Sequence, residues 1–390
     1  MSRLVAVAAV ALLAAVVVTP PAAAQANNTS CAAALATCLA TLTPGSTCDP
    51  PLPVPPTEIV PPIPPAGYQL VRVRPDVAAF LDGAFTSLIV TGDAKRTVVL
   101  VDAPDSSPDS GATSAANNSA GTRLVAALGE VLGASVPSAV HLVYSHAHLD
   151  HLGAASRVAH HVASTFPAAT LTVWGTPETA RVVARSTTRR AVAPTRLVRP
   201  VGVTRIVVGG ATVVDLCVVG GHTETDLAVH IPPAGARPGV LHHVDVVFPG
   251  WAPPFTLAIA VDVGRFATVH RDLLALDWEV FSGGHLTRLG GRADVVASRE
   301  YARDLLSAAA VAVSTVDGAA LGAAGIGAVG DPSSPVYGNS WWAVDRVLRR
   351  LQRDACARAL LRKWGCVLAG LDIMVLDNCY AAVTAIIVEA

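Results

Sequence analysis

The chain has 390 residues with a formal net charge of −1, and only 15% of them are charged, against about 25% in an average soluble domain. A net charge so close to zero points neither to a nucleic-acid-binding protein nor to an acidic tail. Hydrophobic residues make up 52%, so the chain can bury a large core in one extended domain or two smaller ones.

The first residues have the order of a secretory signal peptide. Arg3 supplies a positive charge, Leu4 to Val18 form an apolar run of 15 residues, and Ala22-Ala23-Ala24 follows as a small-residue cleavage site. The apolar run is shorter than the ~20 residues that span a bilayer. We therefore expect an exported protein with a signal peptide over residues 1–24, no stable membrane anchor, and no later stretch apolar enough to span.

A cysteine- and proline-rich leader is expected over residues 25–66, with an extended spacer at 49–65 that proline prevents from forming a helix. Six cysteines lie near the two ends of the chain: Cys31, Cys38, Cys48, Cys356, Cys366 and Cys379. In an exported chain they predict disulfides, although six cysteines allow 15 pairings. Cys217, inside a strand-like run, is predicted to be free.

Residues 67–295 alternate strand-like and helix-like segments and predict a single α/β domain. The expected strands are 68–73, 85–92, 96–104, 140–145, 170–175, 204–210, 212–221, 226–232 and 239–248, and the expected helices are 122–133, 152–164 and 177–186. This order favours two sheets covered by helices on their outer faces. Apolar residues at helical spacing in 298–316 and 341–365 predict a helical C-terminal extension over residues 296–390.

The stretch HAHLDH, residues 146–151, places three histidines and an aspartate on one strand-to-helix turn. His146 and His148 alternate by two on an extended segment, while Asp150 and His151 begin the next helix. One turn can therefore serve two metal positions, which in dinuclear hydrolases lie about 3.5–4 Å apart. Further ligand candidates follow later strand-like runs: His222 and His285, each after two glycines, and Asp245.

The order HAHLDH, GGHTETD, VLHHVD and SGGHL resembles the metallo-β-lactamase-fold hydrolase superfamily over residues 67–295. The resemblance implies an αββα sandwich with a metal site at one edge. It also implies a first metal at His146, His148 and His222, a second at Asp150, His151 and His285, and Asp245 shared by both. Val244 departs from the glycine that frequently precedes this aspartate. His242 and His243 remain candidates for supporting the ligands.

This donor set suits two divalent ions, predicted to be Zn²⁺, with iron or manganese as alternatives. Such ions would supply a metal-bound hydroxide for attack on an ester, lactone or thioester, with Asp150 orienting it and accepting a proton. Phosphodiester or sulfate ester hydrolysis is one alternative, and a non-catalytic, secreted metal-binding protein is the other. Because the dinuclear β-lactamase branches carry Cys or Ser near position 245, β-lactams are disfavoured.

Two further features bear on the substrate, which we expect to be a small molecule. Phe248, Trp251 and Phe255 follow Asp245 and lie either beside the metals, where they would favour an acyl substrate, or in the core. Residues 180–214 hold seven arginines and no acidic residue before Asp215, which predicts either an attraction for anions or a solvated face.

Overall fold

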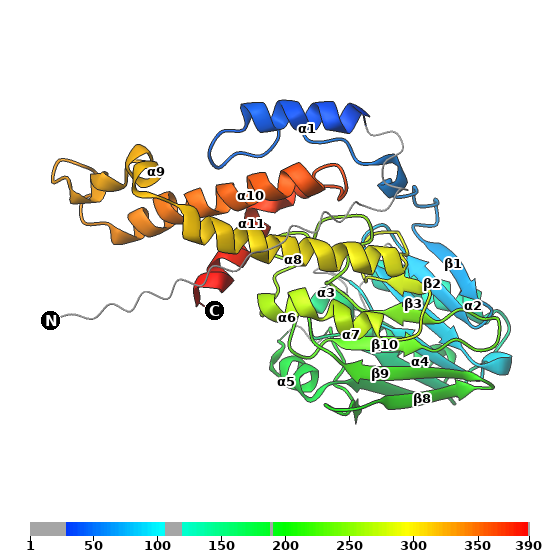
Figure 1. Ribbon diagram of the computed structural model, residues 1–390. Helices are drawn as coiled ribbons and strands as arrows, with labels where there is room; N and C mark the ends of the chain where they lie inside the picture. Colours follow the sequence, from blue (N-terminus) through cyan, green and yellow to red (C-terminus); the bar gives the residue numbers. More distant parts are fainter. Residues whose placement is uncertain (1–28, 106–118, 188–189, 389–390) are drawn as a thin grey trace.

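The computed structural model describes residues 29–105, 119–187 and 190–388, and two packed β-sheets form its centre (Figure 1). The predicted signal peptide and its cleavage after Ala24 lie outside these residues. Helices cover both outer faces of the sheet pair. The protein therefore has the αββα layers of the predicted fold class, which is confirmed.

The first sheet has seven strands that are neighbours in chain order. They are β1 (Gln69–Arg74), β2 (Val77–Leu81), β3 (Thr86–Thr91), β4 (Thr97–Val101), β5 (Ala139–Val143), β6 (Thr170–Gly175) and β7 (Arg196–Leu197). Strands β1 to β4 are antiparallel, and β4 to β7 are parallel. Parallel neighbours need long connections, which contain the helices α2 (Ala120–Leu132), α3 (Leu149–Leu152), α4 (Ala155–Thr165) and α5 (Pro177–Arg185).

The second sheet has five strands in the order β12-β11-β10-β9-β8. They are β8 (Thr204–Gly209), β9 (Thr212–Val218), β10 (Leu227–Ile231), β11 (Val240–His242) and β12 (Val280–Ser282). All neighbours are antiparallel except β11 and β12, which are parallel. The connection between β11 and β12 contains α6 (Val263–Thr268) and α7 (His270–Leu274).

Successive side chains of a strand point to opposite faces of its sheet and so pack in different hydrophobic cores. On β2, Val77 and Ala79 face the second sheet and pack in one core with Val229 of β10. Their neighbours Ala78 and Phe80 face the opposite way and pack under α2 and α4. A third core lies between the second sheet and the C-terminal helices. Because strand side chains alternate between faces, the inner strands β2, β3 and β4 are buried on both faces of the first sheet, whereas the edge strands β1 and β7 are partly exposed.

Two parts of the predicted strand pattern were wrong. The run 239–248 forms a strand only at Val240–His242, and Asp245 lies beyond it in irregular chain. Strand β2 was not expected, because all five of its residues are buried and its short, Ala-containing sequence lacks the polar alternation of a half-exposed strand.

The C-terminal extension is helical, as predicted, and covers the second sheet. Its elements are α8 (Arg292–Thr315), α9 (Gly318–Ala323), the 3₁₀ helix η4 (Ile326–Gly330), the π-helix η5 (Trp342–Arg349), α10 (Arg350–Trp364) and α11 (Leu371–Val388). Figure 1 shows α8 crossing the sheet pair, with α10 and α11 packed beside it. Tyr301 of α8 and Trp364 of α10 meet edge to face in this core, with ring centroids 5.9 Å apart.

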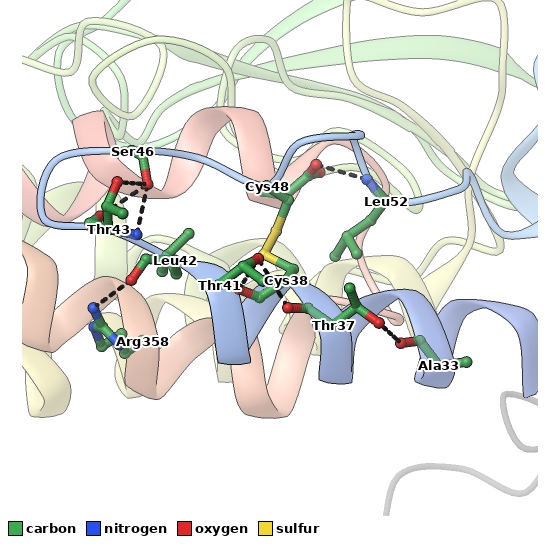
Figure 2. Close-up of a disulfide and its surroundings, with 11 residues drawn as sticks. Ala33, Thr37, Cys38, Thr41, Leu42, Thr43, Ser46, Cys48, Leu52 and Arg358 are labelled. Carbon is green, nitrogen blue, oxygen red and sulfur yellow. Dashed lines mark hydrogen bonds between the residues drawn. A yellow bond between two sulfur atoms is a disulfide. The ribbon is translucent and has the colours of Figure 1, made fainter.

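The leader packs against the extension. Helix α1 (Thr29–Thr41) lies alongside α10 (Figure 1), and a short 3₁₀ helix, η2 (Pro56–Glu58), interrupts the expected spacer. The backbone N–H of Leu52 donates to buried Asp372 at the start of α11, with N and Oδ2 2.8 Å apart. Arg358 of α10 donates to the carbonyl of Leu42 at 3.0 Å, close to the disulfide in Figure 2.

All six peripheral cysteines are paired, and the prediction that Cys217 is free is confirmed. The pairs are Cys31–Cys366, Cys38–Cys48 and Cys356–Cys379. Figure 2 shows Cys38–Cys48 joining α1 to the chain that follows it. Cys31–Cys366 joins the leader to the extension across 335 residues, and Cys356–Cys379 joins α10 to α11.

The expectation that no later stretch is apolar enough to span a membrane was wrong. Helix α11 is 18 residues long and meets that test by length and composition. In this structure it packs against α8 and α10. Its Asp372 and Asn378 are buried and hydrogen-bonded to the leader and to the loop before α6, respectively. These contacts hold α11 against the leader and the rest of the extension.

The long-range disulfide should contribute more to stability than the local one. Chain-entropy arguments assign roughly 3 kcal/mol to a ring of about 10 residues and roughly 5–6 kcal/mol to one of several hundred. We expect Cys31→Ser/Cys366→Ser to lower the calorimetric Tm more than Cys38→Ser/Cys48→Ser. An equal or smaller fall for the Cys31/Cys366 variant would show that this bond does not hold the leader in place.

Candidate metal centre

The HAHLDH turn follows β5, which ends at Val143. Residues 145–147 form a bend, and His148 is the N-cap of the short helix α3 with extended backbone angles, φ −75° and ψ 142°. Asp150 and His151 occupy the first turn of the helix. The helix was expected, whereas the segment that carries His146 is bent and not extended as the two-residue spacing predicted.

His222 lies in the loop between β9 and β10. The carboxylate of Asp226 accepts hydrogen bonds from the backbone N–H groups of His222 at 2.7 Å and Thr223 at 2.8 Å. Gly221, with φ 138°, brings the backbone close to Val246, whose Cγ2 would lie 2.8 Å from an added Cβ. Glycine is therefore required before this histidine.

His285 and Asp245 come from the loops that follow β12 and β11. Gly284 precedes His285 with φ 84°, and a Cβ there would lie 2.5 Å from Cγ1 of Val244. Val244 thus fills the space against the second GGH turn. Asp245 itself has φ 64°, a left-handed conformation that aspartate tolerates better than most residues.

All seven predicted ligands converge. They form two groups, in each of which the ligand atoms lie within 4.8 Å of one another: His146, His148, His222 and Asp245 in one, and Asp150, His151 and His285 in the other. In the first group, His148 Nδ1 lies 2.8 Å from His222 Nε2. In the second, His151 Nε2 lies 3.0 Å from His285 Nε2. This grouping is the one that the resemblance implied for two ions.

Asp245 lies between the two groups. Its Oδ2 is 3.4 Å from Nε2 of His146 and 3.4 Å from Nε2 of His151, while its Oδ1 is 3.0 Å from Nε2 of His285. One carboxylate therefore faces ligands of both groups. This position is suited to a shared ligand.

The charge distribution fits divalent cations. Burial lowers the pKa of His222 to about 4 and, together with neighbouring His151, holds the pKa of His146 well below its usual range. These imidazoles are therefore neutral, as metal ligands must be. The Nε2 of His146 is buried and makes no hydrogen bond with the described residues. A bound cation would satisfy it.

The second group attracts positive charge. Burial would lower the pKa of His151, but the carboxylates of Asp245 and Asp102 outweigh it and raise that pKa well above the ordinary value. Conversely, burial would raise the pKa of Asp245, but His151, His285 and His146 hold it well below its usual range. The carboxylates of Asp245 and Asp102 thus favour a positive charge at His151, and a cation that bound there would displace the proton of this imidazole.

Asp102 is a supporting residue that sequence reasoning missed. It follows β4 with φ 65° and accepts hydrogen bonds from the backbone N–H of Ser145 at 2.7 Å and its hydroxyl at 2.8 Å. Its Oδ2 lies 3.3 Å from Nδ1 of His151 and 3.6 Å from Nε2 of His242. Carboxylates placed behind ligating histidines orient the ring. An aspartate at the end of a buried apolar strand was the available signal.

The other histidines lie outside the cluster, and most of them have local hydrogen-bond partners. His242 Nδ1 is 2.8 Å from the hydroxyl of Ser282, and His243 Nδ1 is 3.2 Å from the carbonyl of Leu227. The indole N–H of Trp174 donates to His141 at 3.1 Å. Of the two candidates for a supporting histidine, His242 is the one whose Nε2 faces Asp102, at 3.6 Å from Oδ2.

A pocket of about 600 Å³ opens onto the cluster, a volume typical of small-molecule sites. Five of its 20 lining residues are histidine or aspartate, and all five are ligand candidates: His148, Asp150, His222, Asp245 and His285. The remaining walls are glycine or apolar and include Phe248, Trp251 and Phe255. The indole N–H of Trp251 donates to the carbonyl of Glu58 at 3.1 Å. Of the two places expected for the three aromatic residues, beside the metals or in the core, the structure shows the first, since all three line the pocket at the cluster.

We expect Asp102→Asn to weaken binding of the second ion by about 10–100-fold, because the change removes the charge that faces His151. Wild-type protein should hold two divalent ions per chain by elemental analysis, and competition with a chelator measures the affinity. Asp215→Asn is the matched control, since that carboxylate pairs with Arg205 on the other sheet at 2.6 Å. Unchanged affinity in Asp102→Asn would rule out the supporting role.

Comparisons with known proteins find similarity at the level of solved structures. No family model and no curated protein matches the chain. A metallo-beta-lactamase from Pontibacter korlensis matches with TM-score 0.46 and 16% identity, over 60% of this chain and 99% of that one. One from Erythrobacter litoralis matches with TM-score 0.44 and 15% identity, over 62% and 99%. A beta-lactamase domain protein from Burkholderia ambifaria matches with TM-score 0.45 and 16% identity, over 80% and 92%.

At these identities and TM-scores, the likenesses carry no argument about activity. The fold rests on the chain's own layers, with a seven-stranded and a five-stranded sheet between helical layers. The ligand candidates lie at the ends of strands from both sheets, in the order that the motifs implied. The protein therefore has the metallo-β-lactamase fold.

Proposed function

We propose that this protein is an exported, dinuclear metal-dependent hydrolase that acts on an ester, lactone or thioester. One observation carries the proposal: seven histidine and aspartate side chains converge, and five of them line a pocket whose other walls are apolar. In this proposal His146, His148 and His222 hold one ion, Asp150, His151 and His285 hold the other, and Asp245 is shared.

The ions are proposed to be Zn²⁺, with iron or manganese as alternatives. When bound, they would supply Lewis acidity and lower the pKa of water toward 7. The metal site thus supplies the chemistry, and the chain's own residues determine which substrate reaches it and in what orientation.

Asp150 is the proposed proton acceptor. Its side chain is 37% exposed and lines the pocket, while its Oδ2 lies 3.5 Å from His151 Nε2 and 3.7 Å from His285 Nε2. It can therefore hold a water molecule over the cluster and accept its proton. The water oxygen forms a bond to the carbonyl carbon, the C–O or C–S bond to the leaving group breaks, and the leaving group takes a proton.

The lining of the pocket favours a carbonyl substrate over a phosphodiester or sulfate ester. Neither lysine nor arginine is among the described residues that line it. The described arginines of the 180–214 segment lie elsewhere: Arg181 pairs with Glu178, and Arg205 pairs with Asp215. Binding an anionic group would therefore depend on the metal ions alone, whereas an apolar acyl group would contact most of the surface.

Export is supported by the three disulfides, which are typical of oxidising compartments. It also accords with the signal-peptide pattern at the N-terminus of the sequence.

The activity should depend on Asp150. We expect Asp150→Asn to lower kcat for the best substrate by about 10²–10⁴-fold, because an amide cannot accept the proton. The measurement is a screen of zinc-loaded protein across lactones, thioesters, esters, phosphodiesters and β-lactams. Asp345→Asn, in the extension and outside the lining of this pocket, is the control. Full activity in Asp150→Asn would sink this role, and an inactive protein with both ions bound would favour a non-catalytic metal-binding protein.

Secretion should remove the first 24 residues. Expression in a host with a signal peptidase should give an extracellular protein whose N-terminal residue is Gln25, since cleavage is expected after Ala24. Mass spectrometry of the purified mature chain checks this. Secreted protein that retains Met1 would contradict cleavage.

A further inference from the structure

One wall of the pocket is built by segments that supply no ligand candidate. Pro254, Phe255, Ala258 and Ile259 come from the loop before α6, and Ile373 and Met374 come from α11. We call Phe255, Ile259, Ile373 and Met374 the apolar wall. Its α11 half belongs to the C-terminal extension, so the extension contributes directly to the pocket.

The apolar wall leaves large apolar side chains open to solvent. Phe255 is 64% exposed, Ile259 is 57% exposed and Ile373 is 53% exposed. Each would be more stable in contact with another apolar surface. Single exposed apolar residues are ordinary, but a group of them around a pocket marks a binding surface.

The loop half of the wall has a strained backbone. Phe255, Leu257, Ala258 and Ile259 all have positive φ, between 53° and 57°. This left-handed backbone conformation is unfavourable for residues other than glycine, above all for a β-branched residue such as isoleucine. Such strain persists only where the surrounding structure holds it, and it is concentrated at functional sites.

The extension holds this strained loop. Buried Asn378 of α11 accepts a hydrogen bond from the backbone N–H of Leu257 at 2.9 Å. Its amide nitrogen donates to the carbonyl of Pro253 and to the hydroxyl of Tyr301, each at 3.0 Å. The backbone of Ala369 also bonds to the chain at Ala252 and at Gly250, at 3.0 Å each. The two halves of the wall are thus fixed to each other.

We propose that the apolar wall binds an unbranched aliphatic chain of the substrate while the ester group lies over the His/Asp cluster. This inference rests on the proposed hydrolase function and narrows its substrate class. An aliphatic chain is the occupant that fits, because the histidines and aspartates that line the pocket lie at its metal end and the side chains of the wall offer only carbon and sulfur surface.

The test compares two substrate series with zinc-loaded full-length protein. One series extends the acyl chain of 4-nitrophenyl esters from acetyl to decanoyl, and the other extends the alcohol of acetate esters from methyl to decyl. In one of the series kcat/KM should rise about threefold to fourfold for each methylene that the wall covers. Ile373→Asn should lower the value for the longest substrate at least about tenfold and leave the acetyl or methyl ester nearly unchanged.

Ile387→Asn is the matched control, because Ile387 lies on the same helix, is 39% exposed and is not part of the pocket lining. It should leave both series unchanged. If esters are hydrolysed but neither series depends on chain length, the wall proposal is overturned and the hydrolase proposal stands. Equal losses in Ile373→Asn and Ile387→Asn would also overturn it.

A binding measurement separates the two proposals. Titration calorimetry of metal-free protein with methyl ketones of four to ten carbons should show affinity that rises with chain length and falls in Ile373→Asn. If no ester is hydrolysed, the hydrolase proposal fails, and these ketones still decide whether the wall binds an aliphatic chain. Affinities that do not change with chain length would overturn the wall proposal.

Discussion

The carboxylate of Asp245 connects the two sheets at the site, because it contacts histidines that come from both of them. It reaches His146 and His151 from the first sheet and His285 from the second, with contacts of 3.0–3.4 Å. A buried carboxylate is costly unless positive charge surrounds it. The cluster of Asp245 and its histidine neighbours therefore forms only when the two sheets pack with their strand ends at the same edge. The inter-sheet core of valine, leucine and isoleucine sets that alignment.

Two further aspartates, Asp102 and Asp226, position the histidines of this cluster. Asp102, directly after β4, faces both His151 and His242 and is anchored by Ser145, which directly precedes the ligand candidate His146. Asp226 holds the loop of His222 through backbone N–H groups. Carboxylates at three strand ends thus fix the positions of imidazoles. The arrangement keeps the rings in place without any charged side chain in the apolar half of the pocket.

Much of this could be read from the sequence. The layers followed from the alternation of strands and helices, and the seven ligand candidates followed from one dense motif and from histidines placed after glycine pairs. Asp102 was not found, although it ends the apolar run VVLV, because an aspartate at that place is equally typical of a turn. Strand β2 was missed because burial on both faces removes the alternating pattern. Phe255 was one of the residues considered for a place beside the metals. Its position next to Ile373 and Met374 of α11 was beyond sequence reasoning, since these residues are more than 100 positions away and carry no local signal.

The disulfide between Cys31 and Cys366 has a consequence for the order in which the chain matures. Synthesis proceeds from the N-terminus at about 5–20 residues per second, and the two cysteines are 335 residues apart. The thiol of Cys31 therefore waits on the order of tens of seconds for its partner to appear. Cys38 and Cys48, only 10 residues apart, can pair at once and so are removed as competing partners. The Cys38–Cys48 bond thus reduces the number of wrong partners for Cys31. The leader can pack on α10 only after the last helices have been synthesised.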